Sequence, residues 1–217
     1  MKAKKVTILV GLAAVLVAIG VIIAIWLYNN GRLYLSSEDA YVDGRQIVIG
    51  APASGKVVDW SGFVGSTFSS GSTVGAIQTQ MGNAASDVSI PVPTNATIVD
   101  RSAVNNEFVA AGTPLAYAYN MNDLWVTANI NETQLHSLKL GDVVDVSVDG
   151  YPGMQLEGQV ARIGLATANT FSLLPSSSSN ANFTKVNQVI PVKINIQGYQ
   201  GLGLIPGLSV TVRIHLQ

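Results

Sequence analysis

The sequence predicts a mainly β protein with three parts: an N-terminal transmembrane helix, a small domain of two repeated halves, and a small β-barrel with one short helix. Three observations predict this fold class. Residues 6–28 form an uncharged apolar run, and a pattern of 33 residues occurs twice, at 47–79 and 88–120. Residues 121–217 alternate apolar and polar side chains between turn signals, which is typical of strands with one buried face.

The apolar run begins at Val6 and ends at Tyr28. As a helix it would be about 34 Å long, enough to cross a hydrocarbon core of about 30 Å. Trp26 and Tyr28 lie at its far end, where amphipathic rings favour the headgroup layer, and three lysines precede its near end. We therefore expect a single-pass anchor in the cell (cytoplasmic) membrane, with the N-terminus in the cytoplasm and the C-terminal domains extracytoplasmic.

A cleaved signal peptide is the alternative interpretation of residues 1–28. The apolar run is longer than the usual apolar core of such a peptide, and no small-x-small cleavage site is present before Asn29. The sequence therefore favours the uncleaved anchor, followed by a linker and first strand over residues 29–46.

The repeat places matching residues 41 positions apart without a gap. The identities are Ile49, Pro52, Val58, Asp59, Ser61 and Gly71 with Ile90, Pro93, Val99, Asp100, Ser102 and Gly112. The matched Pro, Asp and Gly are turn-forming residues. Two units that cannot each bury an apolar face are expected to pack together. We expect one pseudo-symmetric β domain over residues 47–120, with residues 80–87 as the short loop between its halves.

Residues 121–217 predict about five strands and one short helix, which suggests a closed or nearly closed barrel. Asn131 is expected to cap a helix over residues 133–140, which Gly141 ends. A polar loop over residues 166–182 carries an apolar island that includes Phe171, Leu173, Leu174 and Pro175. Such an island often marks a partner site, so we predict a partner contact there. The alternative is that the island folds back and plugs one end of the barrel.

The composition and motifs exclude several classes of function. Twelve basic and thirteen acidic residues leave no basic stripe for nucleic acid. The absence of cysteine excludes disulfides, thiolate nucleophiles and thiolate metal sites. His136 and His215 are far apart in the sequence, acidic residues are scattered, and no phosphate-binding or hydrolase motif is present. We predict a protein that is not an enzyme and has no catalytic residue, cofactor or metal.

Several segments resemble HlyD-type membrane fusion proteins, also called periplasmic adaptors. Asp39-Ala40-Tyr41-Val42 and residues 48–57 resemble the membrane-proximal start of that family, and the repeated halves resemble those of a biotinyl/lipoyl-like domain. Residues 124–134, the apolar island, and the stretch with Phe183 and Lys185 are similar to the EmrA-like branch. Phe183 stands where that branch usually has Trp, and Val189 where it usually has Arg. The resemblance adds Phe183 and Lys185 to the candidate partner contact.

The resemblance implies an adaptor of a multidrug or small-molecule export system. It implies docking on a transporter of the major-facilitator, EmrB-like type, with an ABC exporter as the alternative, and a possible homo-oligomer. The family's long α-helical hairpin is replaced here by residues 80–87, so contact with an outer-membrane duct is not expected. Carrier domains modify a Lys between the halves, and residues 80–87 contain none. The alternative function is a stand-alone envelope protein whose β domains bind cell-wall polymer or an exported protein.

Overall fold

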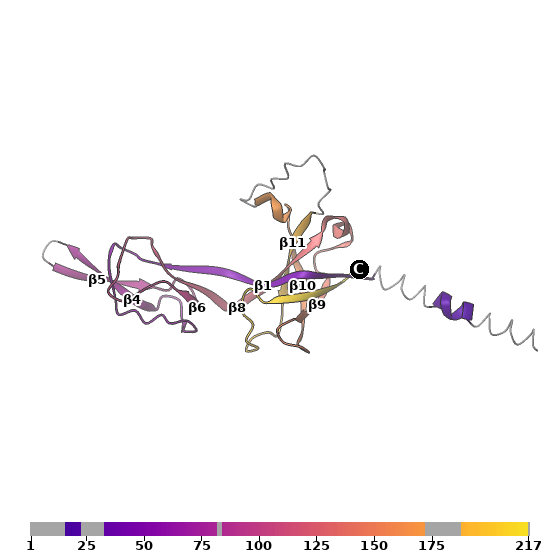
Figure 1. Ribbon diagram of the computed structural model, residues 1–217, viewed down its shortest axis with the longest axis horizontal. Coiled ribbons are helices and arrows are strands. Elements are labelled where there is room, and N and C mark those ends of the chain that lie inside the picture. Colours follow the sequence, from indigo (N-terminus) through magenta and orange to yellow (C-terminus); the bar gives the residue numbers. More distant parts are fainter. Residues whose placement is uncertain (1–15, 23–32, 82–83, 172–187, 217) are drawn as a thin grey trace, which may run out of the picture. The chain divides into compact units, whose positions relative to one another are not determined.

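A computed structural model describes residues 16–22, 33–81, 84–171 and 188–216 (Figure 1). The chain forms two compact units. Unit 1 is drawn from Met1–Ala40, Ala128–Ile194 and Val210–Gln217, and unit 2 from Tyr41–Thr127 and Asn195–Ser209. The two longest strands, β1 (Tyr34–Gly50) and β8 (Pro114–Asn131), contribute residues to both units.

Residues 16–22 are helical and exposed. Over the ranges that the structure describes, no helix combines the length and the apolarity that crossing a membrane requires. Val6, Trp26 and Tyr28 of the predicted anchor lie outside those ranges. The anchor therefore stays a prediction.

The strands of unit 1 form a barrel. Its strand order is β1, β12 (Ser209–His215), β9 (Val143–Val148), β10 (Gln155–Ile163), β11 (Val189–Ile196) and β8. An additional pairing of β1 with β8 closes the ring, so in the described chain six strands make a closed barrel. The mainly β fold and the closed barrel that the sequence predicts are confirmed.

Alternation along the strands fills the barrel. Val144 and Val146 of β9 are fully buried, and Asp145 between them faces outward. In β12, Val212 is also fully buried and is the register partner of Val146. Each fully buried Val or Ile contributes about 1.5–3 kcal/mol of hydrophobic free energy relative to an exposed one. The period of two in the sequence therefore sets which face of each strand points into the barrel.

The short helix of the barrel is a 3-10 helix, η1 (Glu132–Ser137), and it ends earlier than the predicted residue 140. Asn131 is its N-cap as predicted, because its side chain accepts a hydrogen bond from the Thr133 N–H. The helix ends where Leu138 adopts an extended conformation and becomes buried. The tight turn after Ser137 already buries Leu138, so the helix does not continue to residue 140.

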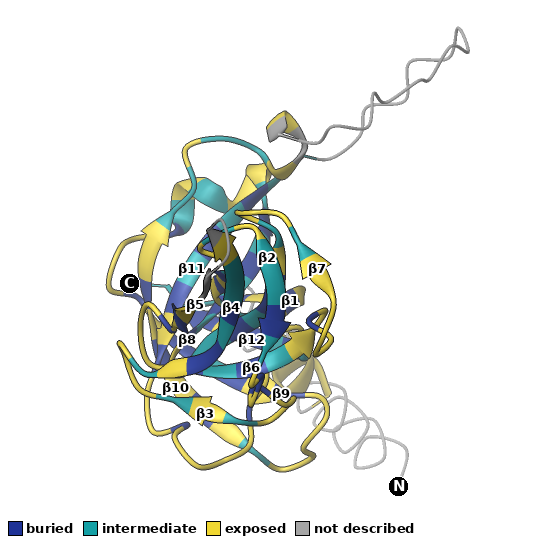
Figure 2. Ribbon diagram, turned by 90° about the vertical axis from the view of Figure 1, so that its left-hand side faces the viewer, coloured by how far each residue is buried: buried dark blue, intermediate teal, exposed yellow. Residues whose placement is uncertain are grey.

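Unit 2 contains two sets of paired strands. One sheet has the order β5 (Ala84–Pro91), β4 (Thr73–Met81), β2 (Gly55–Val58) and β7 (Phe108–Val109). The other set continues from β8 to β6 (Ala96–Arg101) and β3 (Thr67–Phe68). Repeat-related residues share the core, among them Ile49 with Ile90 and Val57 with Ile98. In Figure 2 the buried residues follow the strands, and the turns are exposed.

Several backbone hydrogen bonds in unit 2 repeat with the 41-residue offset, and two such pairs join one half to the other. The Ala51 N–H donates to Thr113 O at 2.9 Å, and the Val92 N–H donates to Ser72 O at 2.8 Å. Side-chain caps repeat as well: Ser54 Oγ accepts from the Ala111 N–H, and Asn95 Oδ1 from the Ser70 N–H. Each half therefore closes turns of the other half.

Strands extend further into the junction between the halves than the sequence suggests. Residues 80–87 are predicted as a loop, but β4 and β5 pair through Gln80↔Ala85 and Met81↔Ala84. The Thr79 hydroxyl also donates to Ser86 O at 3.0 Å. The shortness of the junction suggests a loop, yet ladder hydrogen bonds use only the backbone, so the two strands continue into it. This β-hairpin occupies the place between the halves.

A substitution at Gly55 tests how closely β2 packs against β4. A Cβ at Gly55 would collide with Gln78 O and would lie 2.8 Å from Ile77 Cγ2, whereas a Cβ at Gly50 would meet its nearest atom at 3.6 Å. We expect Gly55→Ala to lower the free energy of unfolding by about 1–3 kcal/mol, because the strands must separate. Gly50→Ala, the control, should change it by less than about 0.5 kcal/mol. Equal denaturant midpoints for the two variants would contradict this packing.

Candidate functional site

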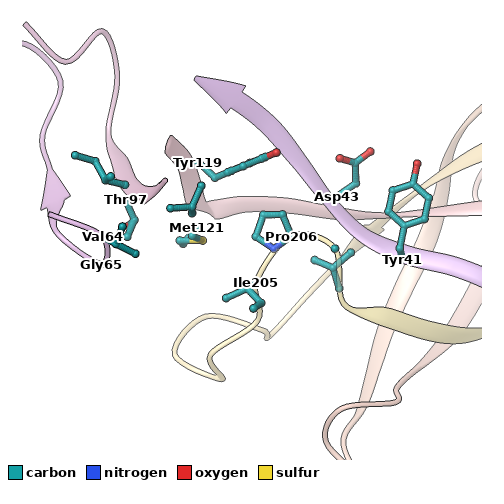
Figure 3. A pocket seen from close by; sticks show the side chains of 13 residues that line it. Tyr41, Asp43, Val64, Gly65, Thr97, Tyr119, Met121, Ile205 and Pro206 are labelled. Atoms are coloured by element: carbon teal, nitrogen blue, oxygen red, sulfur yellow. The ribbon is translucent and has the colours of Figure 1, made fainter. Parts of the chain in front are cut away.

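Unit 2 contains a pocket with a cavity volume of about 590 Å³ (Figure 3). Its lining comes from β1, the turn before β3, β6, β8 and the segment before β12. All of these lining residues belong to unit 2. The pocket therefore lies entirely within unit 2.

One lip of the pocket is formed by Ile205, Pro206 and Gly207. Two backbone bonds attach this segment to β1: the Gly207 N–H donates to Val42 O at 2.7 Å, and the Val42 N–H donates to Leu208 O at 2.8 Å. Ile205 nevertheless keeps 53% of its surface exposed. The segment is fixed by its backbone while its apolar side chain stays accessible.

A buried tyrosine, Tyr199, attaches the chain just before this segment to β8. Tyr199 is only 4% exposed, and its hydroxyl oxygen accepts a hydrogen bond from the Leu124 N–H of β8 at 2.8 Å. Leu124 is itself buried, so this backbone donor has no access to bulk water. The bond anchors residues 199–207 to the strand that carries the pocket wall.

The opposite lip is Val64, which is 64% exposed. The turn around it is fixed to β6, because the Gly65 N–H donates to Ile98 O at 2.8 Å and the Ile98 N–H donates to Ser66 O at 3.0 Å. Ile98 belongs to the buried core and forms part of the pocket floor. The floor is therefore rigid, and the lips present apolar side chains.

Tyr119 and Met121 line the pocket from β8 (Figure 3). They are two residues apart on one strand, so their side chains share a face. The Tyr119 ring lies close to Gly44, where a Cβ would be 3.1 Å from Tyr119 Cδ1. The absence of a side chain at Gly44 gives the ring its room. Within the described residues, the Tyr119 hydroxyl has no hydrogen-bond partner.

The charged residue on the pocket lining is Asp43. Its Oδ1 accepts from the Gly44 N–H at 2.8 Å, and its Oδ2 accepts from the Thr127 hydroxyl at 3.0 Å. Tyr41 and Asp43 alternate with Val42 along β1, so their side chains leave the strand on the face opposite Val42 (Figure 3). No Lys, Arg or His is among the described residues that line the pocket. The interior is apolar and uncharged.

The two histidines lie outside this pocket. His215 Nε2 is 2.7 Å from Asp145 Oδ2 across β12 and β9, and the His215 ring packs edge-on against Tyr34 at 4.9 Å. The Arg213 guanidinium lies 4.0 Å from the Tyr34 ring centroid. These contacts join β12 to its two neighbours in the barrel, β1 and β9. Nowhere in the described ranges do three or more His, Asp or Glu side chains gather in a way that could hold a metal ion.

The sequence-predicted partner contact cannot be placed. Phe171 ends a short 3-10 helix, η2 (Ala168–Phe171), and its side chain is outside the description. Leu173, Leu174, Pro175, Phe183 and Lys185 lie outside the described residues. Both the contact and the barrel plug stay predictions. The pocket was missed from the sequence, because its lining comes from five separated segments.

Tyr199→Phe tests the bond that positions the pocket lip. Phe keeps the ring but removes the acceptor, and the buried Leu124 N–H then costs about 1–3 kcal/mol in free energy of unfolding. Tyr117→Phe is the control, because within the described chain the Tyr117 hydroxyl makes no hydrogen bond. It should change stability by less than about 0.5 kcal/mol. Thermal unfolding of both variants checks this, and an unchanged midpoint for Tyr199→Phe would refute the anchoring role.

Comparison with known proteins places the chain. The family model of the AAEA-like beta-barrel domain matches residues 123–215. YhbJ of Bacillus subtilis (strain 168), named as an efflux system component, is 39% identical over 181 residues, which cover 83% of this chain and 79% of that protein. The multidrug export protein EmrA of Escherichia coli (strain K12) is 32% identical over 111 residues, 49% of this chain and 28% of EmrA.

The chain thus spans most of YhbJ and less than a third of EmrA. The solved structure of the periplasmic adaptor protein EmrA has a similar fold, with a TM-score of 0.56 over 85% of this chain and 99% of that chain, at 12% identity. Because the similarity to YhbJ extends over most of both chains, this chain belongs to the HlyD-type membrane fusion proteins, in their EmrA-like branch.

Proposed function

We propose that this protein is the membrane-anchored adaptor subunit of a multidrug or small-molecule export system. The observation that carries the proposal is the similarity to a named efflux system component over 79% of that component's length. A shared barrel alone would support only a shared fold. Similarity along most of both chains supports a shared role.

The proposed anchor is the run from residue 6 to residue 28. Its length, its terminal Trp26 and Tyr28, and the lysines before it support a single crossing with the N-terminus in the cytoplasm. The parts of both compact units that follow residue 28 would then be extracytoplasmic. Residues 29–32 alone separate the run from the first described residue of the barrel segment, and four residues reach at most about 14 Å. The barrel would lie next to the membrane.

We assign the repeated halves of unit 2 to a biotinyl/lipoyl-like domain. The exchanged hydrogen bonds at the 41-residue offset support this assignment. Carrier chemistry is not part of the proposal, because residues 80–87 contain no lysine to modify. The role is binding and alignment, without catalysis.

The proposed partner is an export transporter in the same membrane, of the major-facilitator, EmrB-like type. Phe171, Leu173 and Leu174 are the proposed contact, since they form an apolar island in a polar loop. The short β4–β5 hairpin supports an adaptor that works without reaching an outer-membrane duct, because Met81 pairs with Ala84 and leaves two residues between the strands.

The absence of cysteine allows a direct test of topology. Phe108→Cys introduces one thiol at a site that is 77% exposed in unit 2. We expect a membrane-impermeant maleimide to label it in intact protoplasts. Lys2→Cys, on the other side of the apolar run, should react only after the protoplasts are permeabilised. The reverse pattern would refute the proposed orientation.

Co-purification tests the partner. The full chain, extracted from its native membrane, should carry a multi-spanning transporter, and deletion of its gene should raise drug susceptibility. Phe171→Ser combined with Leu173→Ser should lower transporter recovery, because the apolar contact is lost. Leu202→Ser, an exposed leucine of unit 2, is the control and should leave recovery unchanged. Unchanged susceptibility on deletion together with no recovered transporter would count against the adaptor function.

A further inference from the structure

We propose that the pocket of unit 2 binds a neutral, aromatic small molecule. This inference goes beyond the adaptor function and does not depend on the anchor or on the transporter. It rests on the side chains that line the pocket, on the charges that are missing from it, and on a comparison that the repeat itself provides.

The two halves of unit 2 give an internal comparison, because several lining residues of the pocket have repeat equivalents in the other half. The backbone there is held in the same way: the bond from the Gly65 N–H to Ile98 O has its counterpart in the bond from the Asn106 N–H to Val57 O, each 2.8 Å. The side chains differ. At the pocket are Val64, Thr97 and Tyr119, and at the equivalent positions are Asn105, Lys56 and Gln78.

The repeated fold therefore accepts polar residues at these positions. Mutual packing does not account for the apolar ones either, since Val64 and Ile205 on the two lips remain mostly exposed. Apolar side chains that neither the fold nor the core requires, gathered around one cavity, indicate a surface kept for a ligand.

The size of the cavity indicates what fits. About 590 Å³ lies inside the range of about 300–1,000 Å³ that is usual for small-molecule sites. The Tyr119 ring offers an aromatic edge or face, and the Met121 thioether is polarisable and packs well against aromatic rings. An aromatic ligand matches this pair of side chains.

The charges of the lining argue against an anionic ligand. No cationic side chain lines the described pocket, so an anion would lose its hydration without a partner. The Asp43 carboxylate accepts hydrogen bonds from the Gly44 N–H and the Thr127 hydroxyl, and Figure 3 shows it pointing away from Met121 and Ile205, so the space between those two side chains holds no charged group. The Tyr119 hydroxyl, which has no partner in the described chain, would hydrogen-bond one polar atom of the ligand.

Methionine methyl NMR measures binding at this pocket. The chain has four methionines, of which Met121 lines the pocket and Met154 lies in the barrel. The full chain, labelled with ¹³C at the methionine methyl groups and held in lipid nanodiscs, is titrated with N-phenyl-1-naphthylamine, a neutral aromatic probe. We expect the Met121 methyl signal to shift and saturate while that of Met154 stays fixed.

The repeat supplies the variants. Val64→Asn and Tyr119→Gln introduce the residue types that the other half already carries, so the backbone should tolerate them. Each should weaken the probe's Kd roughly fivefold or more, because apolar contact is lost. Phe108→Thr is the matched control: it removes an exposed apolar side chain elsewhere in unit 2 and installs the residue type of Thr67, its equivalent. It should leave the Kd unchanged.

The charged analogue 8-anilinonaphthalene-1-sulfonate should bind more weakly than the neutral probe. The proposal is overturned if the Met121 signal does not move, or if Met121 and Met154 shift together without saturation, as partition into lipid would give. It is also overturned if Val64→Asn instead lowers transporter recovery without affecting the probe, which would assign the pocket to a protein partner. The NMR titration tests the pocket and co-purification tests the adaptor function, so either proposal can fail while the other holds.

Discussion

Hydrogen bonds exchanged between the two halves hold unit 2 together. Ala51 of the first half binds the backbone of Thr113, and Val92 of the second half binds that of Ser72. A half on its own would leave these donors and acceptors unpaired, and an unpaired buried backbone group costs about as much as a lost hydrogen bond. Neither half is therefore a complete folding unit. At matching positions of the sequence repeat, each half completes the hydrogen bonds of the other.

The same constraint fixes where the pocket can form. The turn that carries Val64 is hydrogen-bonded to Ile98 of the other half. The lip at Val64 and the floor at Ile98 therefore come from different halves, and backbone hydrogen bonds hold them together. Residues 199–207 then complete the cavity through Tyr199 and Gly207. A site assembled from backbone-fixed segments keeps its shape when its side chains change, which is how the two halves could diverge in chemistry while their turns stayed alike.

Much of the fold could be predicted because it follows local periodicity. Alternation predicts the barrel strands, and Asn131 predicts the start of η1, since both depend on neighbours in the sequence. The junction at residues 80–87 was predicted as a loop because eight residues are too few for a helical hairpin, but backbone pairing such as Met81↔Ala84 carries no side-chain signature. The pocket could not be predicted, because Val42, Val64 and Ile205 meet only through tertiary structure.

A signal for the pocket nevertheless exists in the sequence once the repeat is aligned with itself. Positions shared by the halves, such as Gly71 and Gly112, both with positive φ, report what the fold requires. Positions where the halves differ in polarity, such as Tyr119 against Gln78, report what the fold leaves free. Some positions whose polarity the fold does not fix are nevertheless apolar, partly exposed and beside a cavity. Core packing does not explain an apolar side chain at such a position. In a pseudo-symmetric domain, each half thus serves as the structural control for the other, and the asymmetry between them locates binding chemistry that neither half alone would reveal.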